Sequence, residues 1–120
     1  MYEYKAKILR VIDGDTLKAL IDVGFNMHHE AVIRLNGIDC PETRTKNIEE
    51  KTKGLEAKER MIELLEKCNY EVNIKSHGLD KYGRCLAEVI SITPHGEYKN
   101  LNRILLDEGL AKDYFGGSKD

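Results

Sequence analysis

The sequence predicts a mainly β fold with two helices (α+β), in which five short strands form a small barrel. Three observations lead there: five apolar-rich runs of strand type, tight turns joining the first three of them, and two segments with apolar residues at helical spacing. Strands joined by tight turns pair antiparallel, which argues against a parallel sheet. A five-stranded Greek-key barrel of OB type with two packed helices fits this order of elements best. The 120 residues suit a single domain over residues 1–120 with one modest core.

The first three strands are predicted to form a meander over residues 2–12, 16–23 and 30–35. In the first strand, Tyr4, Ala6 and Ile8 share one face before Leu9 and Val11 take over, which predicts a bulge or bend. The run "DGD" after it marks a turn, and "GFNMHH" between the next two strands carries a glycine and an asparagine that suit a hairpin.

Two helices and two further strands complete the prediction: a helix over residues 55–68, strands over 70–76 and 84–92, and a helix over 101–108. The first helix is amphipathic, with Met61, Ile62 and Leu65 at helical spacing. The second helix ends at Gly109, which suits the left-handed position after a helix. Residues 44–54 are polar and lack periodicity, so we expect an exposed, mobile loop there.

The charge balance argues against a general attraction to polyanions. The chain has 19 basic and 21 acidic side chains, a net charge of -2, so a nucleic acid or anionic partner must be held by a local site. The first residues show no apolar run of the kind found in signal peptides or membrane spans, so we expect a cytoplasmic protein without a membrane partner. The three cysteines form no C-x-x-C pair, so free, reduced thiols are expected.

Three short motifs carry the candidate chemistry: "VIDGDT" (11–16), "RLNGIDCPET" (34–43) and "LDKYGRCL" (79–86). Taken alone, each has a bland explanation: an Asp-Gly hairpin turn, a loop with solvated acids, and a polar hairpin turn. Together, in residue types, order and placement at strand ends, the three motifs resemble the signature segments of the staphylococcal nuclease (thermonuclease) family. The resemblance runs from about residue 5 to residue 115.

The resemblance implies hydrolysis of phosphodiester bonds in DNA and RNA, with little base specificity and with 3'-phosphate ends. Such cleavage places negative charge on the phosphoryl oxygens, which Arg34 and Arg84, matching the family's phosphate-binding arginines, would compensate. Arg84 would also assist the leaving oxygen. Lys81 and Tyr82 match residues that hold a neighbouring phosphate, and Glu42 matches the residue that deprotonates the attacking water or orders the hydrogen-bond network around it.

A calcium ion is the implied cofactor, because several carboxylates near one phosphate would repel it unless a cation lay among them. Asp15 and Asp39 match the calcium-binding carboxylates, and Cys40 takes the position whose main-chain carbonyl is a ligand. The family often has threonine at that position, and a thiolate ligand is the alternative reading of Cys40. Asp13 is expected to orient water or the calcium loop from just outside the metal's own ligands.

The C-terminal segment departs from the family. Its members present tyrosines that stack near the base and then a further helix, whereas here Tyr114 and Phe115 precede "GGSKD". Either aromatic ring is a candidate for base stacking, and packing against the last helix is the alternative for both. A glycine-ended tail of this kind also resembles compact members encoded by phages or mobile elements.

Single-stranded or locally opened DNA and RNA are therefore the expected substrates, and a monomer is the expected state. Two other readings remain: a catalytically silent domain of the same fold that binds nucleic acid or protein, and a plain structural OB module. The silent domains typically lack several charged site residues, whereas this chain has Asp15, Arg34, Asp39, Glu42 and Arg84. The sequence therefore favours an enzyme over these two alternatives.

Overall fold

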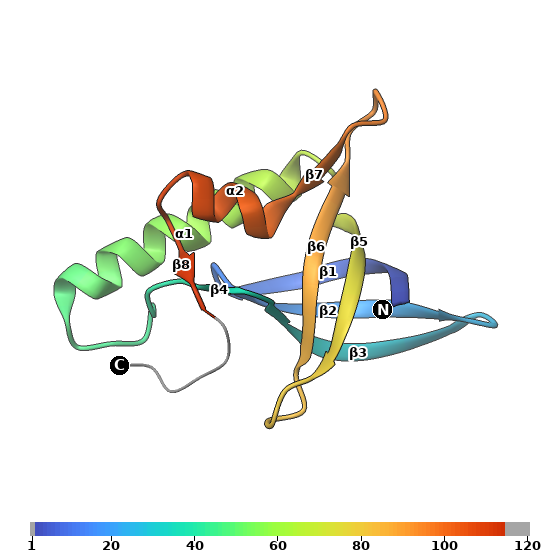
Figure 1. The fold of residues 1–120 in the computed structure, drawn as a ribbon, viewed down its shortest axis with the longest axis horizontal. Helices are drawn as coiled ribbons and strands as arrows, with labels where there is room; N and C mark the ends of the chain where they lie inside the picture. Colours follow the sequence, from blue (N-terminus) through green and yellow to red (C-terminus); the bar gives the residue numbers. More distant parts are fainter. Residues whose placement is uncertain (1, 115–120) are drawn as a thin grey trace.

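The computed structural model describes residues 2–114, which form strands and two helices arranged around a barrel (Figure 1). In chain order the elements are β1 (Tyr2–Asp13), β2 (Thr16–Gly24), β3 (Met27–Leu35), β4 (Ile38–Asp39), α1 (Ile48–Glu66), β5 (Glu71–Leu79), β6 (Cys85–Ile92), β7 (Tyr98–Asn100), α2 (Leu101–Asp107) and β8 (Lys112–Asp113).

The barrel is closed by five strands. β1 pairs antiparallel with β2 and with β5, β2 pairs antiparallel with β3, and β5 pairs antiparallel with β6. β3 then runs parallel to β6, with Arg34 opposite Leu86, and this pairing closes the ring. The five-stranded OB-type barrel with two packed helices that the sequence predicts is confirmed.

Alternation along the strands fills the barrel. Inward side chains from all five strands are buried: Ala6, Ile8, Val11, Leu17, Ala19, Ile21, Ile33, Leu35, Val72, Ile74, Ala87 and Val89. The bend expected in β1 is present as a register shift between Ile8 and Arg10. The bend changes which side chains of β1 face inward, in agreement with the change of face read from the sequence.

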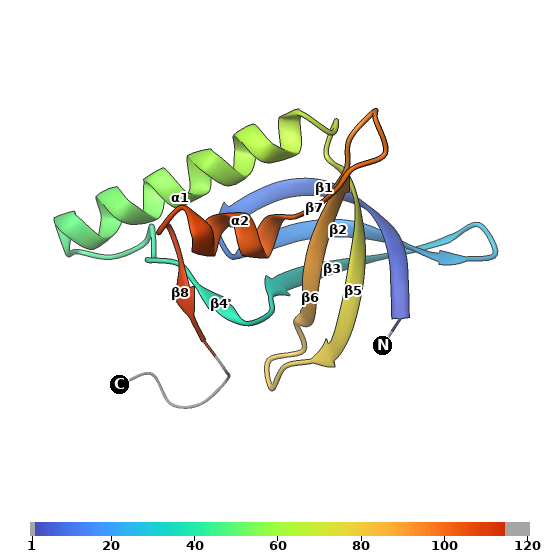
Figure 2. The same cartoon turned by 45° about the horizontal axis from the view of Figure 1, so that its top comes forward.

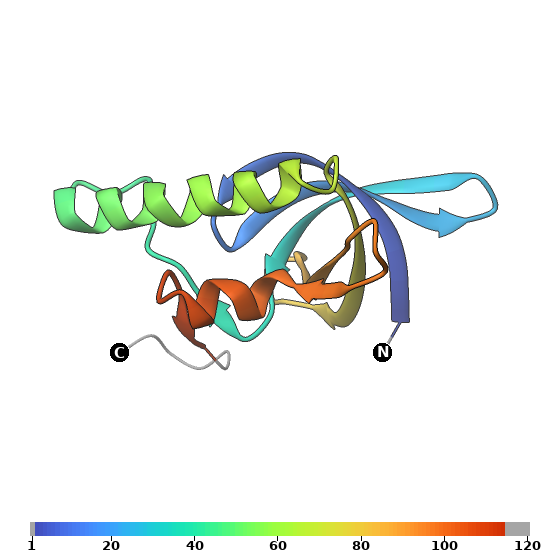
Figure 3. The same ribbon diagram turned by 90° about the horizontal axis from the view of Figure 1, so that it is seen from above.

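The two helices lie beside one another against one side of the barrel, as Figures 2 and 3 show. α1 buries Ala57, Met61, Leu64 and Leu65, and α2 buries Leu101 and Leu105. The exposed charged side chains of α1 face away from this core, as its amphipathic pattern predicted. Gly109 follows α2 with φ +75°, the left-handed conformation expected of it.

The prediction of a loop over residues 44–54 was wrong for its second half, because α1 begins at Ile48. Asn47 caps the helix, its side-chain oxygen accepting a hydrogen bond from the Glu50 N–H at 3.1 Å. The pair is a readable signal, since an asparagine followed three residues later by a glutamate is typical of a helix start. The spacing of apolar residues did not predict the first turns of α1, because residues 48–54 extend beyond the barrel and have no apolar face.

Gly54 explains why the extended helix fits against the rest of the chain. It lies inside α1 and is buried against the main chain of the 41–42 segment. A Cβ atom there would lie 2.6 Å from the carbonyl oxygen of Glu42, closer than side chains approach backbone. The first turns of α1 therefore support the backbone of the 41–42 segment directly.

Candidate active site

Arg34 lies on the outer side of the barrel wall yet is almost fully buried. Its neighbours in β3, Ile33 and Leu35, point into the core with 0% and 1% exposure, so alternation turns Arg34 outward. Its guanidinium contacts the β4 backbone at Ile38 and lies over the ring of Tyr114, which follows β8, and Arg34 keeps only 8% exposure. A guanidinium in such a place must be matched by charge and by hydrogen-bond acceptors.

Two carboxylates and two carbonyl groups supply that match. Nη2 of Arg34 donates a hydrogen bond to Oδ1 of Asp39 at 3.1 Å, and Nη1 forms an ion pair with Oδ2 of Asp15 at 3.4 Å. Nη1 also donates hydrogen bonds to the carbonyl oxygens of Leu35 at 3.1 Å and Ile38 at 2.9 Å. Both carboxylates are 6% exposed, so the three charged groups form one buried cluster with a formal charge of one acid in excess.

The turn between β1 and β2 is what places Asp15. Its main-chain carbonyl accepts a hydrogen bond from the Leu35 N–H at 2.9 Å, and its Oδ2 accepts one from the Cys40 N–H at 2.7 Å. Gly14 lets α1 press on the same turn, since a Cβ atom there would lie 2.8 Å from the Cβ of Ala57. The carboxylate is therefore held from the turn, from β3 and from the start of the 40–47 segment.

Two neighbours of this cluster are fixed by simpler contacts. Burial, together with the nearby Asp15 carboxylate, raises the pKa of the Cys40 thiol to about 12, so the thiol is protonated at neutral pH. Asp13 accepts a hydrogen bond from the hydroxyl of Thr43, which ties the end of β1 to the 40–47 segment.

Glu42 differs from the other acids. Its side chain is exposed, and within residues 2–114 no hydrogen bond or ion pair engages its carboxylate. Its backbone is nonetheless fixed, because the helix packs against it at Gly54. The carboxylate is thus carried on a supported backbone and remains open to solvent.

A second cluster forms at the turn between β5 and β6, around Asp80. Oδ1 of Asp80 accepts hydrogen bonds from the N–H groups of Tyr82 at 2.9 Å and Arg84 at 2.8 Å, and Oδ2 accepts one from Nε of Arg84 at 2.6 Å. Tyr82 is 72% exposed, and both Lys81 and Arg84 lie over its ring, at 5.2 Å and 5.4 Å from the centroid. Within the described chain the terminal nitrogens of Arg84 make no hydrogen bond, so they remain available for a ligand.

The pairing of β3 with β6 places both clusters on the same stretch of barrel wall. Leu86 of β6 lies opposite Arg34 of β3. Because Cys85 and Ala87 are buried inward, Leu86 and Arg84, two residues before it, both face the outer side of the barrel. Tyr114 joins from the C-terminal side: its ring stacks on Arg34 at 5.8 Å, and its N–H donates a hydrogen bond to the carbonyl of Gly37. Phe115, the other candidate for stacking, lies outside the described residues.

The structure thus brings the predicted residues Asp15, Arg34 and Asp39 together, and Lys81, Tyr82 and Arg84 together in a second group. Within residues 2–114 there is no group of three or more His, Cys, Asp or Glu side chains close enough to hold a metal ion. Sequence reasoning gave no role to Asp80, although its spacing of four from Arg84 across a glycine turn is a detectable signal. It also missed a hollow of about 430 Å³ that reaches the cluster and is lined by Asp39, Cys40, Pro41, Glu50, Gly109, Leu110, Ala111 and Lys112.

Asp80→Asn is expected to loosen the side chain of Arg84, which Asp80 holds at Nε. The reaction that Arg84 supports should then slow by roughly tenfold to a hundredfold, because misplacement of a reacting or binding group costs about that much in rate. The three hydrogen bonds outweigh desolvation and hold the pKa of Asp80 below its usual value. A lowered pKa means that this stabilisation is present above about pH 4 and is lost as the pH falls below it. Thermal melts of parent and variant should therefore differ at pH 7 and converge in acid. Activity within about twofold of the parent at saturating substrate would contradict the positioning role.

Comparison with known proteins identifies the family. A family model described as "Staphylococcal nuclease homologue" matches residues 32–120. A protein named micrococcal nuclease, from Shigella flexneri, is 28% identical over 116 residues, which cover 93% of this chain and 59% of that relative. The chain therefore spans about three-fifths of the length of this relative. Between residues 2 and 114 no helix is long and apolar enough to cross a membrane. With about three-quarters of its length matched by the family model, the chain belongs to the staphylococcal nuclease homologues.

Proposed function

We propose that this protein is a calcium-dependent nuclease that hydrolyses phosphodiester bonds of DNA and RNA with little base specificity and leaves 3'-phosphate ends. The observation that carries the proposal is the buried cluster of Asp15, Arg34 and Asp39 on the barrel wall that also carries Arg84. A structural module of this fold has no need for such a cluster, whereas phosphoryl chemistry needs both signs of charge in one place. Single-stranded or locally opened strands are the proposed substrates.

The donor set around Asp15 and Asp39 fits calcium. Two carboxylates and the main-chain carbonyl of Cys40 offer only oxygen atoms, and the formal excess of one negative charge favours a cation. Oδ1 of Asp15 accepts the Thr16 hydroxyl and keeps a second lone pair for a cation, whereas Oδ2 accepts the Cys40 N–H and pairs with Arg34. With so few protein side chains, water would complete the coordination. When bound, calcium would neutralise charge on the phosphoryl oxygens.

The two arginines have different proposed duties. Arg84 is held at Nε by Asp80, which leaves both terminal nitrogens to grip two phosphate oxygens at once. Arg34 already uses both terminal nitrogens on Asp39 and on two carbonyls. A guanidinium carries five N–H groups, so donors remain for a phosphate, and Arg34 would both bind it and hold the two carboxylates in place.

The remaining site residues act on water and on neighbouring groups of the substrate. Glu42 would deprotonate the attacking water or order it, and Asp13 would support the segment that carries Glu42 through Thr43. Lys81 and Tyr82, both exposed beside Arg84, would hold a neighbouring phosphate. Tyr114 on Arg34 is the described candidate for stacking on a base.

Removal of calcium is expected to abolish cleavage of heat-denatured DNA. The reason is that the one negative charge in excess in the cluster of Asp15, Arg34 and Asp39 would then repel the phosphate. The measurement is release of acid-soluble nucleotide with calcium, with excess chelator, and with magnesium as the sole divalent ion. Full activity in chelator, or with magnesium alone, would count against the calcium assignment.

Thermal melts with a nucleoside 3',5'-bisphosphate separate binding from catalysis. A ligand that binds only the folded state adds about 2.7 kcal/mol at a hundred times its dissociation constant, a rise of several degrees in Tm. Calcium and nucleotide together should give more than the sum of their separate shifts. Asp15→Asn should remove most of the calcium contribution, whereas Asp107→Asn, in an exposed pair with Arg103, is the control that retains it. Additive shifts would mean that metal and phosphate occupy separate places.

A further inference from the structure

A hollow of about 610 Å³ lies away from the candidate site, between α1, α2 and the β6–β7 hairpin. We call it the helix groove. Its lining residues are Arg60, Leu64, Lys67, Cys68, Ser91, Ile92, Thr93, Pro94, Tyr98, Lys99, Asn100, Arg103, Ile104 and Glu108. In Figures 1 and 3 these three elements come together at the end of the barrel where β6 finishes.

The charge of the helix groove is opposite to that of the chain. Four of its lining residues are basic and one is acidic, in a protein with a net charge of -2. Glu108 neutralises Arg60 through two hydrogen bonds, at 2.7 Å and 2.8 Å. Arg103 forms an ion pair with Asp107 at 3.4 Å, but both side chains are about 70% exposed. An ion pair this exposed contributes little stabilisation, so it does not hold the Arg103 side chain firmly. In residues 2–114 Lys67 and Lys99 form no ion pair, so positive charge is available to a ligand.

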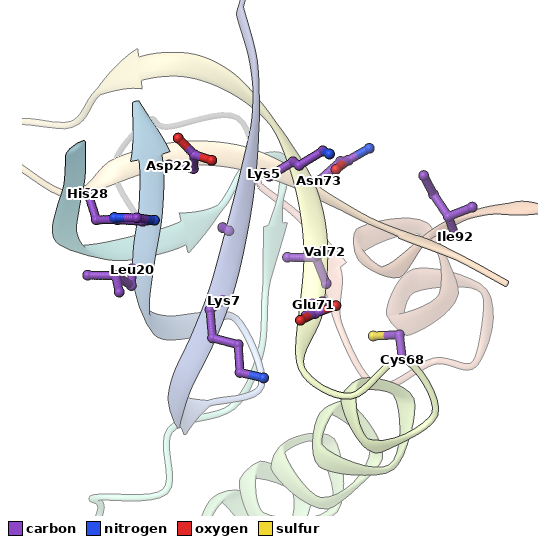
Figure 4. Close-up of a pocket in the computed structure, with 11 residues that line it drawn as sticks. Lys5, Lys7, Leu20, Asp22, His28, Cys68, Glu71, Val72, Asn73 and Ile92 are labelled. Carbon is purple, nitrogen blue, oxygen red and sulfur yellow. The ribbon is translucent and has the colours of Figure 1, made fainter. Parts of the chain in front are cut away.

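A smaller hollow of about 380 Å³ on β1, lined by Lys7, Ile8, Leu9, Arg10, Val11, Ile62 and Tyr70, is also basic, whereas two larger hollows are not. The one in Figure 4, about 470 Å³, balances Lys5 and Lys7 against Asp22 and Glu71. It adjoins the helix groove, because Cys68 and Ile92 line both. The hollow beside Asp39 has two acids and one lysine. An anionic ligand of the free protein is therefore favoured in the helix groove over these two larger hollows.

The rim of the helix groove adds an aromatic surface to the positive charge. Tyr98 is 74% exposed on the β6–β7 hairpin, with Ile92 beside it at 41%. Tyr98 lines the same hollow as Lys67, Lys99 and Arg103. An exposed ring in a groove with lysine and arginine is the combination with which proteins hold single-stranded nucleic acid, bases on the ring and phosphates on the cations.

We propose that the helix groove is a second contact for a single nucleic-acid strand, with Lys67, Lys99 and Arg103 on its phosphates and Tyr98 on a base. The proposal rests on the proposed nuclease function. Arg84 precedes β6 and Ile92 ends it, a span of about 26 Å at the rise of a strand. Figure 1 shows the β5–β6 turn and the β6–β7 turn at opposite ends of these strands. A dinucleotide in the candidate site therefore does not reach the helix groove, and a long strand does.

The test compares a long single-stranded oligonucleotide with a dinucleotide as substrates. The triple variant Lys67→Gln, Lys99→Gln, Arg103→Gln should raise KM for the long strand about tenfold, with kcat and all dinucleotide constants unchanged. Loss of three phosphate contacts should also lower the salt slope of long-strand binding by roughly 2. The matched control is Lys18→Gln, Lys51→Gln, Lys53→Gln, which removes the same charge from positions that line none of these hollows.

Tyr98 tests the stacking half of the proposal. Tyr98→Ala should raise KM for the long strand about fivefold, and Tyr98→Phe should restore the parent value because the ring is kept. Unchanged constants in the triple variant, or equal loss on both substrates, would overturn the second contact. So would displacement of the oligonucleotide by polyglutamate at the same charge concentration, which would indicate an acidic protein as the ligand.

Failure of the nuclease proposal itself is recognised separately. If the parent protein cleaves neither substrate, fluorescence anisotropy of the labelled long strand decides the question. Weaker binding by the triple variant than by its control supports the second contact without catalysis. Equal binding by the two variants, or no binding by the parent, overturns it.

Discussion

Arg84→Lys and Arg34→Lys are each expected to slow cleavage by about a hundredfold to a thousandfold, the loss seen when one donor to a transition-state oxygen is removed. A lysine keeps the charge but offers a single point donor, whereas a guanidinium grips two phosphate oxygens in fixed geometry. The loss should fall on kcat more than on KM, because the charge that the arginines meet develops in the transition state. The measurement is steady-state cleavage of heat-denatured DNA with saturating calcium.

The two variants should differ in stability. Arg34 donates hydrogen bonds to Asp39 and to the carbonyls of Leu35 and Ile38 in a buried place, so Arg34→Lys should lower the free energy of unfolding by about 1–3 kcal/mol. Arg84 is partly exposed and paired with Asp80, so Arg84→Lys should cost about 1 kcal/mol or less. Denaturant melts give both values. If either variant folds normally and cleaves within about threefold of the parent, that arginine does not bind the scissile phosphate.

Glu42→Gln is expected to lower kcat by about a hundredfold to ten thousandfold, if the carboxylate takes the proton of the attacking water. The amide keeps the shape of the side chain and its capacity to accept a hydrogen bond, but it accepts no proton. A residue that only orders water would lose less. Because the Glu42 side chain makes no hydrogen bond or ion pair within residues 2–114, the Tm should stay near that of the parent.

The pH profile separates the two roles of Glu42. A general base gives a rate that rises with pH through its own pKa, and this limb should disappear in Glu42→Gln. An ordering role would leave the limb in place with a uniformly lower rate. Glu59→Gln, on the exposed side of α1, is the control for loss of one acid. Glu42→Gln with parental kcat would remove this residue from the mechanism.

The sequence by itself predicted the elements whose pattern is local. Five apolar-rich runs, the first of them alternating, predicted the barrel strands β1, β2, β3, β5 and β6, and the change of face after Ile8 predicted the bend. The three motifs also carried the resemblance to the staphylococcal nuclease family, which the family model confirms. The same pattern missed β4 and β8, which are two residues each and exist because they pair with one another.

The helix start and the two arginines show what only the tertiary structure decided. Periodicity reports which residues face the core, and the first turns of α1 leave the core to support the backbone at Glu42 through Gly54. In the same way, alternation turns both Arg34 and Arg84 outward, but it does not say what covers the outer side. The pairing of β4 with β8, more than seventy residues after Arg34, leads the chain to Tyr114, whose ring lies against that guanidinium. Arg34 also contacts Asp15 and Asp39, whereas Arg84 stays partly exposed at its turn. Burial on the outside of a barrel depends on pairing between distant segments, and local residue spacing carries no record of it.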